Sequence, residues 1–308
     1  MTFRFNPWLL VAGLMGLIFA AVGGLYYYRA RVDWTPQVMT SYLPRVNAAV
    51  VYLDIEKLRD AGLLEILAGS RAVEEPEYRK FVGESGFDYR TDLDRVAISF
   101  QGDNRYLVVR GKFDWMKLNQ FAVHRGGLCR NSVCNYSQPD TLNRFNSFYP
   151  LRPNVMTLYT GTSDWGVYEV SQNRIDPATF PIPDAPVWAL LPSILWRQAT
   201  LPPGAKAFAS LFGEADSILM SITQESTTRF HMAADLSCSD PKTATSIHLR
   251  LREATDLLNK MMAREHQVPN PHDLSGVLSG GSFQVDGTHV KANWPIEKGF
   301  LESIADGK

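Results

Sequence analysis

Ser239 and Lys242 are the residues whose types and spacing come nearest to a catalytic pair. They are the first and last residues of the string Ser239-Asp240-Pro241-Lys242, at the expected start of a helix. An S-x-x-K string places the lysine one helical turn from the serine, so the amine can take the hydroxyl proton during acyl transfer. No K-T-G string accompanies it, and Ser or Asp followed by Pro is also an ordinary helix start. We expect a helix cap and keep an anchored serine hydrolase or transpeptidase as the alternative.

Metal, nucleotide and dinucleotide sites have no recognisable signature in the chain. H-E-x-x-H is typical of zinc sites, the Walker loop of nucleotide sites and G-x-G-x-x-G of dinucleotide sites. All three motifs are absent from the sequence. The six histidines are dispersed. His231 and His289 alternate with the apolar residues of their expected strands, so both should face solvent or a second layer. We predict no cofactor and no metal, and an enzyme is the less favoured class of protein.

Cys129 and Cys134 enclose the short string CRNSVC. Their separation suits a disulfide across a hairpin, which an oxidising compartment would preserve. The competing interpretation is two unrelated small apolar residues, because three cysteines are too few for a disulfide framework and Cys238 is left over. We predict a possible disulfide between Cys129 and Cys134.

A long uncharged segment lies near the amino terminus. Residues 7–28, PWLLVAGLMGLIFAAVGGLYYY, contain no charged side chain, and a helix of that length at about 1.5 Å per residue spans the ~30 Å core of a bilayer. Aromatic rings at both ends suit the headgroup regions, and arginines stop the apolar run. The residues assigned to the membrane anchor are Trp8, Tyr26, Tyr27, Tyr28, Arg29 and Arg31.

The segment predicts a single-pass membrane protein whose first partner is the lipid bilayer. Two alternatives stay open: a buried helix, and a cleaved signal peptide, since Ala21-Val22-Gly23 roughly satisfies the small-x-small rule. Arg4 and the α-amine face Arg29 and Arg31 across the segment, so the positive-inside count is close to balanced. We expect the bulk of the chain to be extracytoplasmic, of periplasmic or cell-envelope type, with a cytoplasmic body as the alternative.

The composition is that of a globular protein and disfavours nucleic acid as a partner. The chain has 308 residues, of which 45% are hydrophobic and 20% charged, so it can build a sizeable core. Residues 32–308 contain 28 basic and 32 acidic side chains. Such a surface repels phosphate backbones, and no Lys/Arg block with interleaved aromatic residues is present.

Two strings of the chain resemble each other, NAAVVYLDIEKLR at 47–59 and DAPVWALLPSILW at 184–196. Each places a short apolar run before a helix-like segment. A hairpin with the period-2 alternation of half-buried strands follows each string, and a helix start signal follows each hairpin, at Asp114 and at Asp240. The repetition favours an internal duplication.

We therefore predict an α+β fold: an N-terminal transmembrane helix followed by two similar β-α-β-β-α-β units, each an antiparallel sheet with helices on one face. Closing hairpins are expected over 155–170 and 282–294, the second turning at Asp286-Gly287. The Pro-rich string 174–186 separates the units. The predicted boundaries are 1–6 for a tail, 7–28 for the transmembrane helix, 29–46 for a stalk, 47–173 for the first unit, 174–186 for the connector and 187–308 for the second unit.

No motif names a reaction. The expected function is therefore a membrane-anchored, non-enzymatic binding or scaffold protein of the bacterial cell envelope, whose ligand is an unknown protein or envelope component.

Overall fold

The computed structural model describes residues 34–64, 76–137, 144–172, 182–198 and 210–305. The chain forms two compact units, residues 1–35 and 36–308. The second unit contains every described helix and strand, so the fold is that of this unit.

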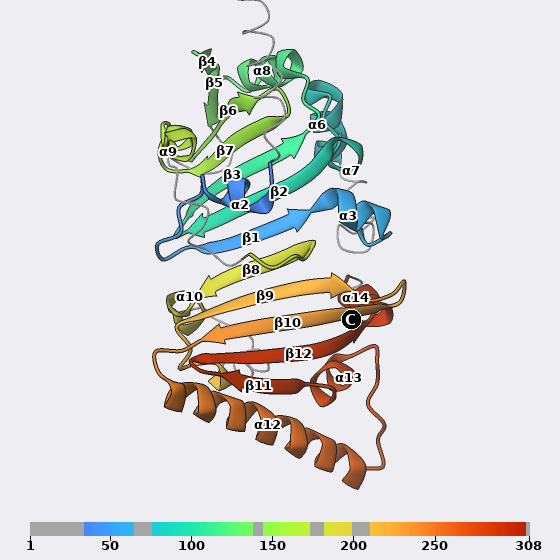
Figure 1. Ribbon diagram of the computed structural model, residues 1–308. Coiled ribbons are helices and arrows are strands. Elements are labelled where there is room, and N and C mark those ends of the chain that lie inside the picture. Colours follow the sequence, from blue (N-terminus) through green and yellow to red (C-terminus); the bar gives the residue numbers. More distant parts are fainter. Residues whose placement is uncertain (1–33, 65–75, 138–143, 173–181, 199–209, 306–308) are drawn as a thin grey trace, which may run out of the picture. The chain divides into compact units, whose positions relative to one another are not determined.

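One antiparallel sheet of twelve strands organises the second unit (Figure 1). Its order is β11-β12-β10-β9-β8-β1-β2-β3-β7-β6-β5-β4. The strands are β1 (Ala49–Asp54), β2 (Leu93–Gln101), β3 (Asn104–Gly111), β4 (Leu128–Arg130), β5 (Val133–Ser137), β6 (Phe145–Arg152), β7 (Val155–Gly161), β8 (Val187–Pro192), β9 (Ser217–Gln224), β10 (Arg229–Ser237), β11 (Ser282–Asp286) and β12 (His289–Glu297).

The two similar strings of the sequence meet in the middle of this sheet. β1 comes from the first string and β8 from the second, and they pair antiparallel from Val50 opposite Leu190 to Leu53 opposite Val187. We call this pairing the seam. On each side of the seam the strand order is the same: outward from β1 it runs β1-β2-β3-β7-β6, and outward from β8 it runs β8-β9-β10-β12-β11. We call these the first and second halves of the sheet.

The predicted fold class, two separate units behind a transmembrane helix, is therefore wrong. A separate unit would leave β1 or β8 as an edge strand, with a row of unpaired backbone N–H and C=O groups. Pairing the two strands removes both edges, so the repeated strings produce one continuous sheet. The division at 174–186 was expected because prolines interrupt secondary structure, yet β8 returns to β1 after that segment.

The predicted single-pass localisation also needs correction. Among the helices of the described ranges, none is long and apolar enough to cross a membrane. The longest of them, α12 (Pro241–Arg264), has 24 residues but carries Arg250, Glu253 and Asp256 in its middle turns. The structure thus gives the single-pass prediction no support. The expected span 7–28 and its flanking anchor residues lie outside the described residues.

The remaining helices are short or of medium length. They are α2 (Pro36–Thr40), α3 (Ile55–Asp60), α6 (Pro76–Ser85), α7 (Tyr89–Asp92), α8 (Trp115–His124), α9 (Gly166–Gln172), α10 (Ser193–Gln198), α13 (Leu274–Ser279) and α14 (Lys298–Ala305). Residues 165–170 had been expected to form the second strand of a hairpin, but the segment 166–172 forms α9. It is helical because Val167 and Val170, three residues apart, are both fully buried, which is the spacing of a helix face.

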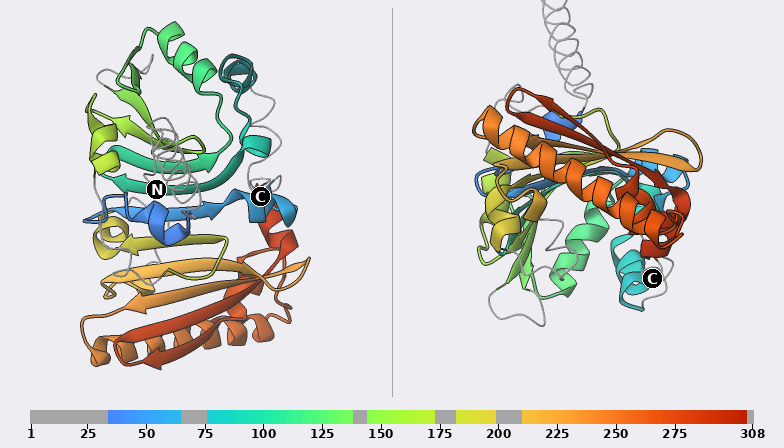
Figure 2. Two further views of the ribbon diagram at one scale, coloured as in Figure 1. Left: turned by 45° about the horizontal axis from the view of Figure 1, so that its top comes forward. Right: turned by 90° about the horizontal axis from the view of Figure 1, so that it is seen from below.

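The main hydrophobic core lies on one face of the sheet, which we call the core face. Strand residues such as Val96, Phe230 and Trp294 on this face pack against Leu118 of α8 and Ile247 of α12. In the right-hand view of Figure 2, α6 and α8 lie on the same side of the sheet. The burial of large apolar side chains here supplies the main stabilisation of the fold.

The opposite face, which we call the second face, is covered in the first half of the sheet. Gly166 of α9 lies against the ring of Tyr159, which is 1% exposed. The Tyr106 hydroxyl donates to the Glu169 carboxylate at 3.0 Å, and α2 contacts β2 and β3. The first half is therefore a three-layer arrangement, with helices on both faces.

The hairpin of β11 and β12 differs from its expected register. Asp286 pairs with His289, so Gly287 and Thr288 form the two-residue turn and Phe283 lies opposite Ala292. Gly287 has a φ of +60°, the left-handed region that glycine adopts readily. The prediction had placed Asp286-Gly287 in the turn.

Candidate functional site

A central apolar cleft of about 950 Å³ lies on the core face and crosses the seam. Its size falls within the range of small-molecule sites in proteins. It takes residues from both halves of the sheet, and α3 and α14 contribute to its walls. Its apolar lining consists of Leu53, Ile55, Leu58, Ala61, Leu63, Leu64, Pro186, Val187, Ile222, Phe230 and Leu301.

The floor of the central cleft is a row of side chains across three strands. Leu53 lies opposite Val187, and Val187 lies opposite Ile222. Directly paired residues of neighbouring strands point to the same face of a sheet. The floor is therefore continuous across the seam, and a molecule seated on it touches both halves.

One wall is built by α3, whose start and end are both fixed by hydrogen bonds. The Asp54 carboxylate caps the helix by accepting from the Lys57 backbone N–H at 3.1 Å. At the other end Gly62 has a φ of +66°, and the Leu63 N–H donates to the Leu58 carbonyl at 2.9 Å. This is the Schellman arrangement, which turns the chain at a left-handed glycine. It brings Leu63 and Leu64 back to the cleft.

The other wall comes from the second half. The backbone N–H of Lys298, the first residue of α14, donates to the Thr228 carbonyl at 2.9 Å. This bond ties the start of α14 to the turn between β9 and β10. Leu301 of α14 and Phe230 of β10, which are 8% and 1% exposed, consequently line the cleft together.

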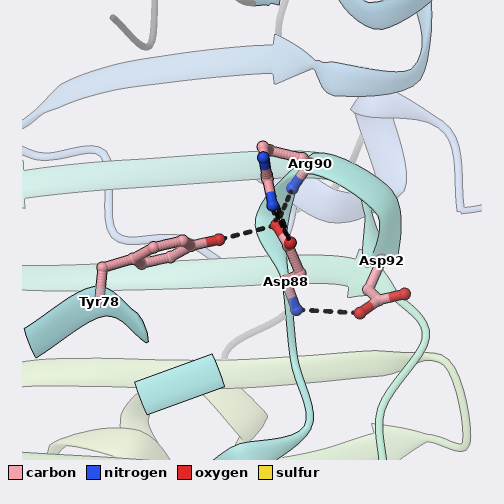
Figure 3. Close-up of polar contacts among 4 residues, drawn as sticks. All are labelled: Tyr78, Asp88, Arg90 and Asp92. Carbon is pink, nitrogen blue, oxygen red and sulfur yellow. Dashed lines mark hydrogen bonds and ion pairs between the residues drawn. The ribbon is translucent and has the colours of Figure 1, made fainter. Parts of the chain in front are cut away.

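Tyr89 lines the cleft. It follows Asp88 in the chain, and Asp88 is the centre of a polar cluster with Tyr78, Arg90 and Asp92 (Figure 3). The Tyr78 hydroxyl donates to Asp88 Oδ1 at 2.7 Å, and Arg90 Nη2 donates to Asp88 Oδ2 at 2.7 Å. The Asp88 N–H in turn donates to Asp92 Oδ2 at 2.9 Å. The rings of Tyr78 and Tyr89 are 5.3 Å apart, so the cluster holds α7 and with it Tyr89.

The charge state of this cluster is set by Arg90. Its hydrogen bonds lower the pKa of the Asp88 carboxyl to about 2, with the Tyr78 hydroxyl contributing in the same direction. Burial and the bond to Asp88 raise the pKa of the Tyr78 hydroxyl. At neutral pH Asp88 is therefore ionised and Tyr78 is neutral, which is the state in which all these bonds form.

The seam is reinforced beneath the floor, on the second face. Tyr52 of β1 and Trp188 of β8 lie opposite each other, and their rings stack with centroids 5.6 Å apart. Such an aromatic pair contributes about 0.5–1.5 kcal/mol beyond its burial. Burial, and then the Asp54 carboxylate, raise the pKa of the Tyr52 hydroxyl, and Arg95 Nε lies 3.5 Å from Asp54 Oδ2. The neutral Tyr52 hydroxyl therefore lies close to the Asp54–Arg95 ion pair on the second face.

The central cleft has an apolar lining that suits the binding of an apolar molecule. Its described lining contains no histidine, cysteine or serine, the residues that most often serve as nucleophile or general base. The charged lining side chains, Lys57, Asp60 and Asp184, stand at its rim. In the described parts of the chain, no group of three or more His, Cys, Asp or Glu residues is arranged to hold a metal ion.

Ser239 and Lys242 lie at the start of α12 and do not line the cleft. Asp240 is the cap of this helix: its carboxylate accepts from the N–H groups of Lys242 at 2.8 Å and Thr243 at 3.0 Å. The Thr243 bonds lower the pKa of the Asp240 carboxyl. Ser239 and Lys242 are both exposed, and no described hydrogen bond joins their side chains. The acyl-enzyme alternative stays a prediction.

The structure places Cys129 and Cys134 in a disulfide, with an S–S distance of 1.94 Å. The two residues lie directly opposite each other in the pairing of β4 and β5. The disulfide therefore fastens the edge of the first half of the sheet, far along the strand order from the seam. His231 and His289 are 46% and 45% exposed in their side chains, as expected.

Sequence reasoning did not find the cleft. Its lining comes from separate stretches of the chain around 53–64, 89, 184–187, 222–230 and 301, and none of them carries a catalytic or ligand motif. The signal was the resemblance between 47–59 and 184–196, because these strings supply the paired strands of the floor. The pairing itself was not visible in the sequence.

Comparisons with known proteins identify no relative. No protein-family model matches the chain, and no curated protein matches it. A solved structure described as "Structure of crystal form I of TP0453" resembles it at 11% sequence identity, covering 84% of this chain and 92% of that chain, with a TM-score of 0.44. A likeness at that level supports no conclusion about function.

Proposed function

We propose that the protein is a non-enzymatic binding protein that holds an apolar ligand in the central cleft. The observation that carries this proposal is the continuous apolar floor of Leu53, Val187 and Ile222. Folding normally buries such side chains against each other. Here they line a space of about 950 Å³, and an apolar ligand would gain about 25 cal/mol for each Å² of apolar surface removed from water.

The location of the cleft adds a second argument. Binding sites are common where two structural halves meet, because residues from both sides converge there. A ligand on this floor would contact β1 and α3 of the first half together with β8, β9 and α14 of the second. It would therefore reinforce the seam, whose direct pairing is limited to the stretch from Val50 to Leu53.

The test is binding of the uncharged dye N-phenyl-1-naphthylamine, whose fluorescence rises in an apolar site. We expect saturable binding to the full chain. Ala61→Phe fills the cleft from the α3 wall and should weaken dye binding at least tenfold. Glu56→Phe is the matched control, because Glu56 is an exposed residue of the same helix that does not line the cleft.

Equal dye affinity of the two variants would contradict the proposal. Thermal unfolding of both variants, followed by circular dichroism, must show a cooperative transition so that a lost site is distinguished from a lost fold. Saturation with the dye should also raise the unfolding midpoint of the unmodified protein, since a ligand that binds only the folded state stabilises it.

A further inference from the structure

The rim of the central cleft carries an excess of negative charge. Lys57, Asp60 and Asp184 line it on the side of α3, and the Lys57 amine lies 3.8 Å from the Asp184 carboxylate. These two groups offset each other. The Asp60 carboxylate is left as the net charge of the rim.

Within the described ranges, charged groups near the rim do not reverse this balance. On α3 itself, Arg59 Nη2 donates to the Leu93 carbonyl at 2.6 Å and so points towards β2. On α14, the Lys298 amine lies 3.7 Å from the Glu302 carboxylate. Beyond Gln224, the Glu225 carboxylate faces the His231 ring at 3.6 Å. The Lys298 amine thus has a carboxylate beside it, and the Arg59 guanidinium is directed to β2 and does not line the cleft.

Another part of the rim is polar, and its described lining residues are uncharged. Gln224 and Thr227, from the end of β9 and the following turn, offer their polar groups there, whereas the Thr223 side chain lies on the second face, opposite His231. Hydroxyl and amide groups can both donate and accept hydrogen bonds. They suit a head group that carries hydroxyl or amide functions.

Resting on the proposed function, we propose that the cleft selects amphiphiles with an uncharged hydroxyl- or amide-bearing head over amphiphiles with an anionic head. The apolar tail lies on the Leu53–Val187–Ile222 floor and the head lies at the rim. A carboxylate head there is repelled by Asp60, whereas a glycerol head is not. Two unit charges about 4 Å apart in water change an affinity by about fivefold.

The experiment compares two ligands with the same twelve-carbon tail, dodecanoate and monododecanoylglycerol, below their aggregation concentrations. Their affinities for the full chain are measured by calorimetry at pH 7.5 and low salt. We expect the glycerol ester to bind about fivefold more tightly. The ratio should shrink at 1 M salt, because screening shortens the reach of exposed charges to about 3 Å.

Asp60→Asn should abolish the difference, while Glu56→Gln should retain it. Both residues are exposed carboxylates of α3, but only Asp60 lines the cleft. Equal or tighter binding of dodecanoate by the unmodified protein would overturn the proposed selectivity while leaving the cleft as a binding site. Failure of both ligands and of the dye to bind would instead overturn the proposed function.

Discussion

The two halves of the sheet share a strand order but differ on the second face. In the first half this face is buried: Val108 and Thr157 are 0% exposed and Tyr159 is 1% exposed. In the second half, the corresponding face of β10 and β12 carries His231, Asp235, His289, Lys291 and Asn293, and its charged side chains are about half exposed. Strand order alone therefore does not decide whether a face is covered.

The difference follows from where the last helix of each half goes. α9 follows β7 and packs on the second face, against Tyr159. α14 follows β12 and packs on the core face, where Phe300 and Leu301 join the main core. As a result the second half gains a wall of the central cleft and leaves its second face polar.

Substitution of matched residues on the second face should have the largest effect. Val108→Asn places an amide among buried residues of the first half and should lower the free energy of unfolding by about 4 kcal/mol. Ala233→Asn makes a similar change on the partly exposed face of the second half and should cost less than about 1 kcal/mol. Chemical denaturation measures both. Similar losses would show that the two faces do not differ in burial.

The packing of α9 on that face can be tested at a glycine. A Cβ at Gly166 would overlap the Tyr159 ring, whereas one at Gly83 in α6 would meet nothing within 4 Å. Gly166→Ala should destabilise by about 1–3 kcal/mol through overpacking. Gly83→Ala should stabilise by about 0.5–1 kcal/mol, because alanine is the better helix former. A neutral effect at Gly166 would contradict the close approach of α9.

The outer edges of the two halves are fastened differently. The Cys129–Cys134 disulfide joins β4 and β5, and replacing both cysteines by alanine should cost about 2 kcal/mol through the lost constraint on the unfolded chain. In the second half, the Lys291 amine lies 2.6 Å from the Asp286 carboxylate. That pair is exposed, so Lys291→Gln should cost at most about 0.5 kcal/mol. Equal losses of unfolding free energy in the double cysteine variant and in Lys291→Gln would contradict the expected difference between the two edges.

The polar cluster at Asp88 predicts that one part of the pH dependence of stability originates in the first half. The folded-state pKa of Asp88 is about 2, below its value near 3.9 in an unfolded chain. Its contribution to stability is therefore complete above pH 4 and disappears as the pH falls towards 2, by about 1–2 kcal/mol in total.

Asp88→Asn should flatten the stability profile between pH 4 and 2. The control is Asp103→Asn, an exposed residue of the turn between β2 and β3, which should leave the slope unchanged. Denaturation curves recorded over this range measure both. An unchanged slope in the Asp88 variant would show that the carboxyl is not held ionised by Arg90.

Local features of the fold could be predicted from the sequence. Alternating residues marked the hairpins of β2 with β3 and β9 with β10, and Asp114 marks the start of α8, where it accepts from the Lys117 N–H. The spacing of Cys129 and Cys134 suits a hairpin disulfide, and the structure places them opposite each other in β4 and β5. In each case the signal lies within a few neighbouring residues, so local stereochemistry is sufficient.

Long-range features could not be predicted. Val50 and Leu190 pair across 140 positions of the chain, and no local pattern encodes that contact. Trp165–Val170 alternates like a strand but forms α9, because Val167 and Val170 find a buried surface on one side. The floor of the cleft depends on the long-range pairing of β1 with β8. Short sequence motifs therefore do not indicate the cleft.

The central claim, that an apolar ligand occupies the cleft and touches both halves, is tested most directly by photocrosslinking. A monododecanoylglycerol analogue with a diazirine in its tail is irradiated with the full chain, and the labelled peptides are identified by mass spectrometry. We expect labels both in 53–64 and in 222–230, and we expect excess unlabelled ester and Ala61→Phe to remove both sets of labels. Labels concentrated instead on exposed apolar residues of α12, such as Leu249, Leu257 and Met261, would contradict the claim.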